Sequence, residues 1–328
     1  MIPISLVIPT YRRVEQTIKT IEILTESMGL GTEIQLQIIV SDASDDRLLE
    51  ERLPASNKYC EIKYTRPPQT GIAYAKNHGA SQASNQILIF CDTDIELEPM
   101  TLLNTLSALQ HNPSVGMVGG TVIWKGSAKD KTIDRPRKED RKFEHHGIEY
   151  IEALYSRYIG TYTKLFHDIG GYDIDVFNMR GEGSDLSIRY WRAGYPLMYD
   201  PKIAVHHIHD VEGGIIRNVP EPELDIAKDL FLLAYKYDMI SRDYENFTKT
   251  VEANFKHDQF AYSKLLRGLL KHIDFIIQKK PVLDIQKQRM NPRYDFKFLE
   301  VFTNSTLLQD CIKSAPELIS NYRQSIFH

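Results

Sequence analysis

The feature that most constrains the fold is a series of short aliphatic runs separated by stretches of helical length. The runs that indicate strands are Ile4–Ile8, Ile34–Val40, Ile87–Cys91 and Val115–Ile123. Helix-sized segments, such as Glu15–Ser27, lie between them. Apolar runs that are continuous rather than alternating are typical of parallel strands covered on both faces. Because such strands are joined by right-handed crossovers, the sequence predicts a mostly parallel, doubly wound α/β sheet.

The chain changes character after residue 221. Ile226–Ile240 and Tyr262–Gln278 have helical patterns, and no convincing strand follows them. We therefore expect a Rossmann-like domain over residues 1–221 and a helical C-terminal region over residues 222–328. Six apolar residues in that region recur near helical spacing, with basic residues between them: Leu265, Leu266, Leu269, Leu270, Ile273 and Ile276. We expect this face to pack on its own domain, and peripheral contact with an anionic membrane is the alternative.

Composition excludes several classes of protein. The 328 residues carry a net charge of −4, which argues against bulk nucleic-acid binding. No apolar run approaches the ~18 residues of a membrane span, and the first residues show no secretory signal pattern. Three cysteines without a C-x-x-C motif argue against a disulfide framework or a thiolate zinc site. We expect a cytoplasmic protein, with association at the cytoplasmic face of a membrane as the alternative.

Polar clusters follow three of the predicted strands: Pro9-Thr10-Tyr11-Arg12, Ser41–Asp46 and Asp92-Thr93-Asp94. In parallel sheets, ligands gather at the carboxyl ends of the strands, so these clusters are expected along one edge. Asp92 and Asp94 are separated by one residue and point to the same side of the chain. Paired carboxylates of this kind suit Mg²⁺ or Mn²⁺ shared with a phosphate group. The sequence thus favours a divalent ion beside Asp94.

A second group consists of His206, His207 and His209, at the end of a strand predicted over Ile203–Ile208. On a strand, His207 and His209 share one face and His206 lies on the other. A neutral imidazole is a suitable further ligand for an ion held by Asp94. The alternative is that these are partly buried polar residues at a strand end.

A third group precedes a helix predicted over Ser184–Ala193, where Glu182 and Asp185 follow Gly181. The helix macrodipole stabilises ionised carboxylates at this end. Two interpretations are open from the spacing alone. Ser184 or Asp185 caps the helix, or a carboxylate here serves as general base toward a hydroxyl nucleophile.

Six motifs together resemble family 2 glycosyltransferases, which have the GT-A fold. In chain order the motifs are Val7–Arg13, Ser41–Asp46, Gly71–Gly79, Asp92–Asp94, Gly170–Asp173 and Glu182–Leu186. The resemblance covers about the first 210 residues and adds nothing on the helical C-terminal region. It implies a nucleotide-sugar site on the α/β sheet.

The resemblance also implies roles for single residues. The segment Pro9-Thr10-Tyr11-Arg12 would border the nucleotide, and Asp42 would contact the base, expected to be uracil. Lys76 and Asn77 would lie near the base and the diphosphate. Asp92 and Thr93 would approach the ribose and the donor sugar. The metal ligands implied are Asp94 and His207, with His209 as the substitute for His207.

The sequence departs from the family pattern at two positions. Arg12 stands where the first motif usually has asparagine. Gly183 stands where the family commonly has the aspartate that serves as catalytic base. Glu182 and Asp185 therefore become the candidate catalytic residues, and the expectation that the transfer inverts the anomeric configuration is weakened.

We expect a metal-dependent, hexosyltransferase-like enzyme that uses Mn²⁺ or Mg²⁺ and a UDP-sugar donor. The acceptor would be a hydroxyl of a growing polysaccharide, a lipid-linked sugar or a protein. A catalytically inactive relative that binds nucleotide is one alternative, and Gly183 is the feature in its favour. A sugar-1-phosphate nucleotidyltransferase is another, but residues 9–13 contain no glycine with which to grip a triphosphate. The absence of a G-x-G-x-x-G sequence there also disfavours an NAD-dependent enzyme.

Overall fold

A mixed sheet of ten strands organises the computed structural model, which describes residues 1–125, 142–154, 156–208, 222–242, 261–296, 302, 305–323 and 326. The strand order is β3-β2-β1-β4-β9-β6-β10-β8-β7, and β5 pairs with β10. The strands are β1 (Ile2–Thr10), β2 (Ile34–Asp42), β3 (Cys60–Thr65), β4 (Ile87–Cys91), β5 (Ile95–Leu97), β6 (Met117–Lys125), β7 (Lys142–His145), β8 (Ile148–Ile151), β9 (Tyr158–Tyr162) and β10 (Leu197–Ile208). The helices are α1 (Val14–Thr25), α2 (Leu48–Arg52), α3 (Ile72–Ser81), α4 (Thr101–His111), α5 (Thr163–Asp168), α6 (Glu182–Ala193), α7 (Pro222–Lys236), α8 (Met239–Arg242), α10 (Ala261–Lys271), α11 (Ile273–Arg289) and α12 (Ser305–Arg323).

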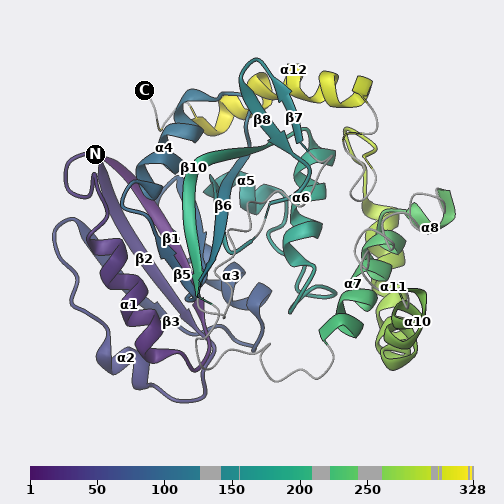
Figure 1. The fold of residues 1–328 in the computed structure, drawn as a ribbon, viewed down its shortest axis with the longest axis horizontal. Coiled ribbons are helices and arrows are strands. Elements are labelled where there is room, and N and C mark those ends of the chain that lie inside the picture. Colours follow the sequence, from purple (N-terminus) through teal and green to yellow (C-terminus); the bar gives the residue numbers. More distant parts are fainter. Residues whose placement is uncertain are drawn as a thin grey trace.

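The predicted parallel core is confirmed. Strands β3, β2, β1 and β4 run parallel in that order, and β6 and β10 form a second parallel pair. Every residue of β4 is buried, which is why its five apolar residues form an uninterrupted run. Helix α1 covers one face of the sheet and α3 the other, as a doubly wound fold requires (Figure 1). The close approach of α3 depends on Gly79, because a Cβ there would lie 2.4 Å from Val7 Cγ1.

Several elements differ from the sequence-based expectation. Strand β9 is antiparallel to both β4 and β6 and separates them. A hairpin of β7 and β8 extends the far edge of the sheet. The helix predicted over Tyr262–Gln278 is two helices, α10 and α11, which meet at His272. Because β9 ends directly at α5 and is fully buried, it lacks the turn signals that mark a strand in sequence.

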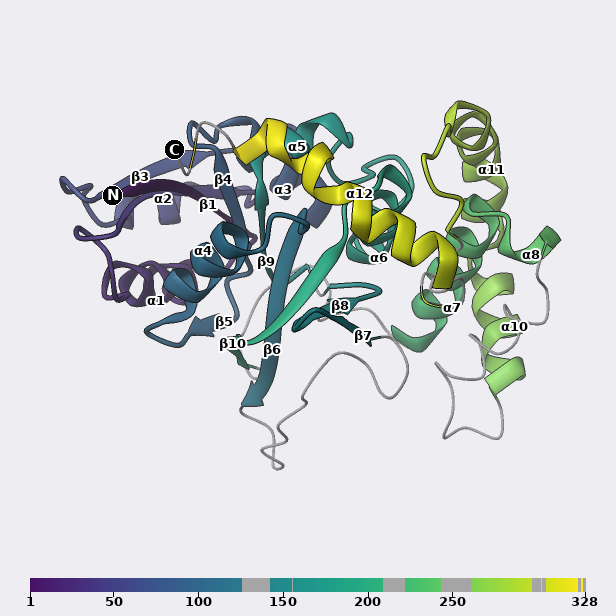
Figure 2. The ribbon, with the colours of Figure 1, turned by 90° about the horizontal axis from the view of Figure 1, so that it is seen from above.

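The C-terminal helices pack against the sheet domain over its described residues. Helix α12 runs from beside α5 past α6 toward α7, as Figure 2 shows. Its Arg323 Nη1 donates to the Leu109 carbonyl of α4 at 2.9 Å. Helix α7 buries Leu232 and Leu233 in the same apolar cluster as the sheet. The boundary between residues 221 and 222 remains a prediction, and buried contacts cross it. None of the described helices has the length and apolarity needed to cross a membrane.

Candidate active site

The segment after β4 places Asp92, Thr93 and Asp94 between the centre of the sheet and the short strand β5. The Asp92 N–H donates to the Arg157 carbonyl at 2.8 Å. The Thr93 carbonyl accepts from the Thr20 hydroxyl of α1 at 3.1 Å, and the Thr93 side chain is buried. Because these backbone contacts hold both sides of the segment, the two carboxylates have fixed positions at the strand end.

Asp94 and His207 lie together, as the resemblance implies. Strand β10 pairs with β5 so that His207 stands opposite Ile95, and the Ile208 N–H donates to the Asp94 carbonyl at 2.8 Å. His207 Nε2 is 3.5 Å from Asp94 Oδ2, and Arg13 Nη1 is 2.9 Å from the same oxygen. Burial raises the pKa of the Asp94 carboxyl, but the nearby imidazole and guanidinium groups lower it more strongly, and the net pKa is lowered.

The donor atoms at this position fit a divalent cation. A carboxylate oxygen of Asp94, directly before β5, and an imidazole nitrogen of His207 in β10 converge, which suits Mn²⁺ or Mg²⁺. Within the described residues no cluster of three or more histidine, cysteine or acidic side chains could hold an ion alone. The remaining ligands would therefore come from phosphate oxygens and water. His206 turns to Glu98 on the other face of β10, and His209 lies outside the described residues.

Asp92 belongs to a buried chain of contacts that leads to Glu182. Lys76 Nζ is 3.1 Å from Asp92 Oδ1 and donates to the Ser156 carbonyl at 2.6 Å. The Ser156 hydroxyl donates to Glu182 Oε1 at 2.7 Å. Lys76 is wholly buried, so its ammonium group is committed to these partners. Burial raises the pKa of Asp92, and the charge of Lys76 opposes this shift.

Asn77 has a positioning role in this structure. Its amide donates to the Tyr172 carbonyl at 2.9 Å and accepts from the Tyr172 N–H at 2.8 Å. Gly171 has φ of +63°, and a Cβ there would lie 2.7 Å from Asn77 Oδ1. The pair therefore fixes the turn that carries Tyr172, whose ring centroid is 5.5 Å from Lys76 Nζ.

Glu182 and Asp185, both at the start of α6, have different surroundings. Asp185 is completely buried and accepts hydrogen bonds from Lys236 Nζ at 2.6 Å, the Tyr237 hydroxyl at 2.8 Å and Arg189 Nε at 2.8 Å. Burial acts to raise the pKa of Asp185, but Lys236 and Arg189 lower it to about 2. Glu182 is 7% exposed and accepts a hydrogen bond from the Ser156 hydroxyl. Three side-chain donors of the protein hold the Asp185 carboxylate, whereas one holds that of Glu182.

The ends of β1 and β2 form the edge at which the nucleotide was predicted. Thr10 stands opposite Asp42 in the parallel register. Asp42 is buried, and its carboxylate accepts from the Ser44 N–H at 2.9 Å and the Tyr64 hydroxyl at 3.1 Å. Burial and the neighbouring Asp42 raise the pKa of Tyr64 to about 12. Asp42 thus holds the loop after β2 in shape.

Arg12 begins the loop after β1 with an unusual backbone. Its φ is +53°, and its N–H donates to the Ser44 hydroxyl at 2.7 Å. The exposed guanidinium pairs with Asp45 at 2.5 Å and lies 5.0 Å from the half-buried Tyr11 ring. Pro9 and Thr10 are buried within the sheet edge. Of the segment Pro9–Arg12, Tyr11 and Arg12 are therefore the residues that are not buried.

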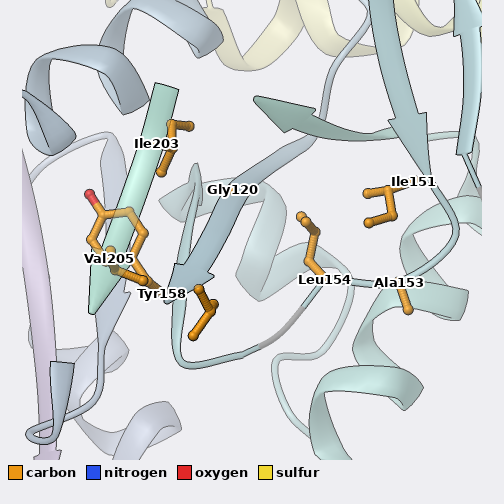
Figure 3. A pocket seen from close by; sticks show the side chains of 8 residues that line it. Gly120, Ile151, Ala153, Leu154, Tyr158, Ile203 and Val205 are labelled. Carbon is orange, nitrogen blue, oxygen red and sulfur yellow. The ribbon is translucent and has the colours of Figure 1, made fainter. Parts of the chain in front are cut away.

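A small pocket with an apolar lining lies beside β6 and β10 (Figure 3). Its lining residues are Gly120, Val122, Ile151, Ala153, Leu154, Tyr158, Ile203 and Val205. None of them is a predicted site residue, and none carries a charge. A nucleoside diphosphate needs cationic or N–H partners, so this pocket is not assigned to the donor.

The sequence did not predict several residues that lie at the site but come from other parts of the chain. Ser156 lies in a short connection between β8 and β9, and Lys236 and Tyr237 come from the end of α7. Asp229 of α7 lies beside Gly181, where an added Cβ would be 3.6 Å from Asp229 Cβ. Burial raises the pKa of Asp229 to about 6, against the charge of Lys228. No motif marked these residues, because each owes its position to tertiary packing.

Comparison with known proteins decides the family. The profile described as glycosyl transferase family 2 matches residues 5–168, which is half of the chain. The chain belongs to glycosyl transferase family 2. It is therefore a glycosyltransferase that takes its sugar from a nucleotide sugar, which agrees with the carboxylates at the strand ends. Family membership favours sugar transfer over nucleotidyl transfer.

Curated relatives are distant. The glucosyl-dolichyl phosphate glucuronosyltransferase of Haloferax volcanii is 22% identical over 219 residues, which are 62% of this chain and 68% of the relative. For several other relatives the match spans only 31–35% of their length and 39–52% of this chain. At this identity the relatives establish the family and leave donor and acceptor open.

Solved structures confirm the predicted GT-A fold. Staphylococcus aureus TarS residues 1–349, solved with UDP-GlcNAc, gives a TM-score of 0.57 at 14% identity over 99% of this chain and 92% of TarS. The mannosyltransferase PcManGT of Pyrobaculum calidifontis, solved with GDP-Man and Mn²⁺, gives 0.53 at 14% identity over 98% of this chain and 87% of that protein. The helical C-terminal region is included in both superpositions.

Proposed function

We propose that this glycosyltransferase uses a UDP-sugar donor, with Mn²⁺ or Mg²⁺ held by Asp94 and His207, and glycosylates a hydroxyl acceptor. The proposal rests on the contacts of the two aspartates that follow β4. Asp94 faces His207, and Asp92, two residues earlier, leads through Lys76 and Ser156 to Glu182. The Mn²⁺ in the PcManGT complex and the UDP-GlcNAc in the TarS complex support this choice of metal and nucleotide.

The residues near the donor stabilise negative charge on the leaving diphosphate. A divalent ion on Asp94 and His207 would offset that charge. Arg13 lies 2.9 Å from Asp94 and adds a fixed positive charge at the same point. Preorganised charge of this kind, aimed where charge develops, lowers the barrier by several kcal/mol. Tyr11 and Arg12 border the nucleotide, and Asp42 keeps the loop after β2 in the shape that receives the base.

Glu182 is the proposed general base. It accepts the proton of the acceptor hydroxyl as that oxygen bonds to the anomeric carbon and the bond to the diphosphate breaks. Asp185 stays ionised among Lys236, Arg189 and Tyr237, so its proposed role is to position α6.

The acceptor is a growing glycan, a lipid-linked sugar or a protein. The cytoplasmic location remains a prediction from the sequence.

The test is UDP release from a panel of UDP-sugars with Mn²⁺ in the presence of candidate acceptors. Asp94→Ala is expected to lower the rate about 100-fold or more. Glu96→Ala is the matched control, because this acid lies two residues after Asp94, in β5, and pairs with Lys19. Glu182→Gln is expected to lower kcat by about 100-fold while UDP binding is retained. UDP release that is indifferent to Asp94→Ala would contradict the proposal.

The second candidate is a nucleotide-binding protein without transferase activity. Gly183, at the position where the family commonly has its base, favours it. Calorimetry with UDP and each UDP-sugar distinguishes the two candidates. An inactive protein binds UDP and leaves every donor intact over hours, whereas the enzyme shows slow hydrolysis or transfer.

A further inference from the structure

An apolar stripe on α10 and α11 faces away from the rest of the protein. Its members are Leu266, Leu270, Ile273 and Ile277, with exposed fractions of 57%, 62%, 43% and 62%. Their spacing of four, three and four residues places them on one helical face. Helical hydrogen bonds continue where the two helices meet, since the His272 N–H donates to the Gly268 carbonyl and the Ile276 N–H to the His272 carbonyl. We call these four residues the outer stripe.

The opposite face of the same helices packs on the protein. Leu265, Phe275 and Ile276 lie against the core, and Leu283 is buried. The apolar face between Leu265 and Ile276 was predicted to pack on its own domain, and only part of it does so. Both views show α10 and α11 beyond α7, on the side away from the sheet (Figures 1 and 2). Four large aliphatic side chains in one continuous row are more than the scattered exposed residues of an ordinary surface.

The charge around the outer stripe is opposite in sign to that of the whole chain. Residues 261–289 contain seven lysines and arginines against two aspartates, whereas the complete chain has a net charge of −4. Arg267, Lys271 and Lys280 are exposed on these helices. An apolar stripe with a basic border is the pattern of a helix that lies in the headgroup region of a membrane. Basic side chains near such a surface are attracted to anionic lipids.

We propose that the outer stripe binds the surface of a lipid bilayer that contains anionic lipids. The aliphatic side chains insert at the headgroup boundary, and the basic residues beside them pair with lipid phosphates. A second copy of this chain is the weaker occupant, because two such surfaces would bring like charges together. The inference does not depend on sugar transfer.

The test is co-sedimentation of the full chain with vesicles of phosphatidylcholine alone or with about 30% phosphatidylglycerol. We expect the partition coefficient to be at least about tenfold higher for the anionic vesicles and to fall in high salt. The double variant Leu270→Gln, Ile277→Gln is expected to lose about tenfold in binding. The matched control is Leu48→Gln, Met100→Gln, because these residues are 55% and 41% exposed far from the outer stripe.

The outcomes separate clearly. Circular dichroism and thermal melting check that each variant is folded, and the UDP-release assay without vesicles reports on the site independently. Equal binding to both vesicle types, or a stripe variant that binds as the native chain does, overturns the proposal. A concentration-dependent dimer in light scattering that the stripe variant abolishes also overturns it, because the stripe then belongs to a self-association surface.

Discussion

Lys236→Met tests the buried clamp that joins α7 to the start of α6. Lys236 Nζ is 2.6 Å from Asp185 Oδ1 and 2.8 Å from Asp173 Oδ2, and all three side chains are at most 6% exposed. Methionine keeps the length and removes the charge. The variant therefore leaves two buried carboxylates without their shared cation. Asp185 keeps its contacts with Arg189 and Tyr237, which limits the damage.

The magnitude follows from the burial. Removing one partner of a buried ion pair costs about 3–5 kcal/mol, because the remaining charge is desolvated and unpaired. Unfolding a chain of 328 residues changes the entropy by about 0.7 kcal/mol per kelvin at ~2.1 cal/mol/K per residue. A loss of about 4 kcal/mol then lowers Tm by about 6 °C if the chain unfolds as one unit.

The assay is thermal unfolding at pH 7, with Lys164→Met as the control. Lys164 pairs with Asp168 at 2.6 Å, but their side chains are 73% and 40% exposed, so this pair contributes less than about 0.5 kcal/mol. A Tm for Lys236→Met that matches the control would refute the reasoning.

We also expect the effect of Lys236→Met on folding stability to depend on pH. The pKa of Asp185 is lowered to about 2 from an ordinary value of 3.8, so its stabilising contribution is present above pH 3.8 and is lost as the pH falls toward 2. In Lys236→Met, Asp185 loses one of the cations that lower its pKa, so its buried carboxylate takes up a proton at higher pH than in the native chain. The difference in stability between variant and native chain should therefore shrink between pH 7 and pH 4, and a difference that grows contradicts this account.

Three further predictions concern single residues. His207→Ala should raise the Mn²⁺ concentration required for half-maximal UDP release about 10–100-fold, measured by metal titration. Asp229→Asn should stabilise the protein by up to about 3 kcal/mol at pH 8 and little at pH 4. The reason is that a carboxyl with a pKa raised to about 6 contributes its stability below pH 3.8 and loses it as the pH rises through 6. Gly79→Ala should destabilise by about 1–3 kcal/mol in urea, because the new Cβ would lie 2.4 Å from Val7 Cγ1.

The hydrophobic pattern of the sequence was sufficient to predict the parallel strands of the core, but it did not predict the elements around them. The run Ile87–Cys91 coincides with β4 because a strand buried on both faces has no polar positions. Strand β9 was not predicted, because its antiparallel position between β4 and β6 depends on pairing with strands that are distant in the sequence. Leu266, Leu270 and Ile273 of the outer stripe were expected to be covered, because periodicity identifies an apolar face but does not say what packs on it.

The candidate site was predictable where neighbours in sequence supply it and unpredictable where tertiary contacts do. The proximity of Asp94 and His207 followed from the resemblance, and the structure gives the reason in the β5–β10 pairing. Nothing local distinguished Glu182 from Asp185, because both begin the same helix. The difference comes from Lys236 and Tyr237, which lie 51 and 52 residues beyond Asp185.

The glycine at position 183 and the contacts of Glu182 form one arrangement. A Cβ on Gly183 would lie 3.0 Å from Ser156 Cβ and 3.1 Å from its hydroxyl, closer than side chains ordinarily pack. An aspartate at this position would therefore push Ser156 aside. Ser156 is the residue that donates to Glu182 and whose carbonyl accepts from Lys76, the partner of Asp92. Glycine at position 183, in place of the usual aspartate, thus leaves room for Ser156, which orients Glu182. We expect Gly183→Asp to disrupt the connection between Glu182 and Asp92 rather than restore a base.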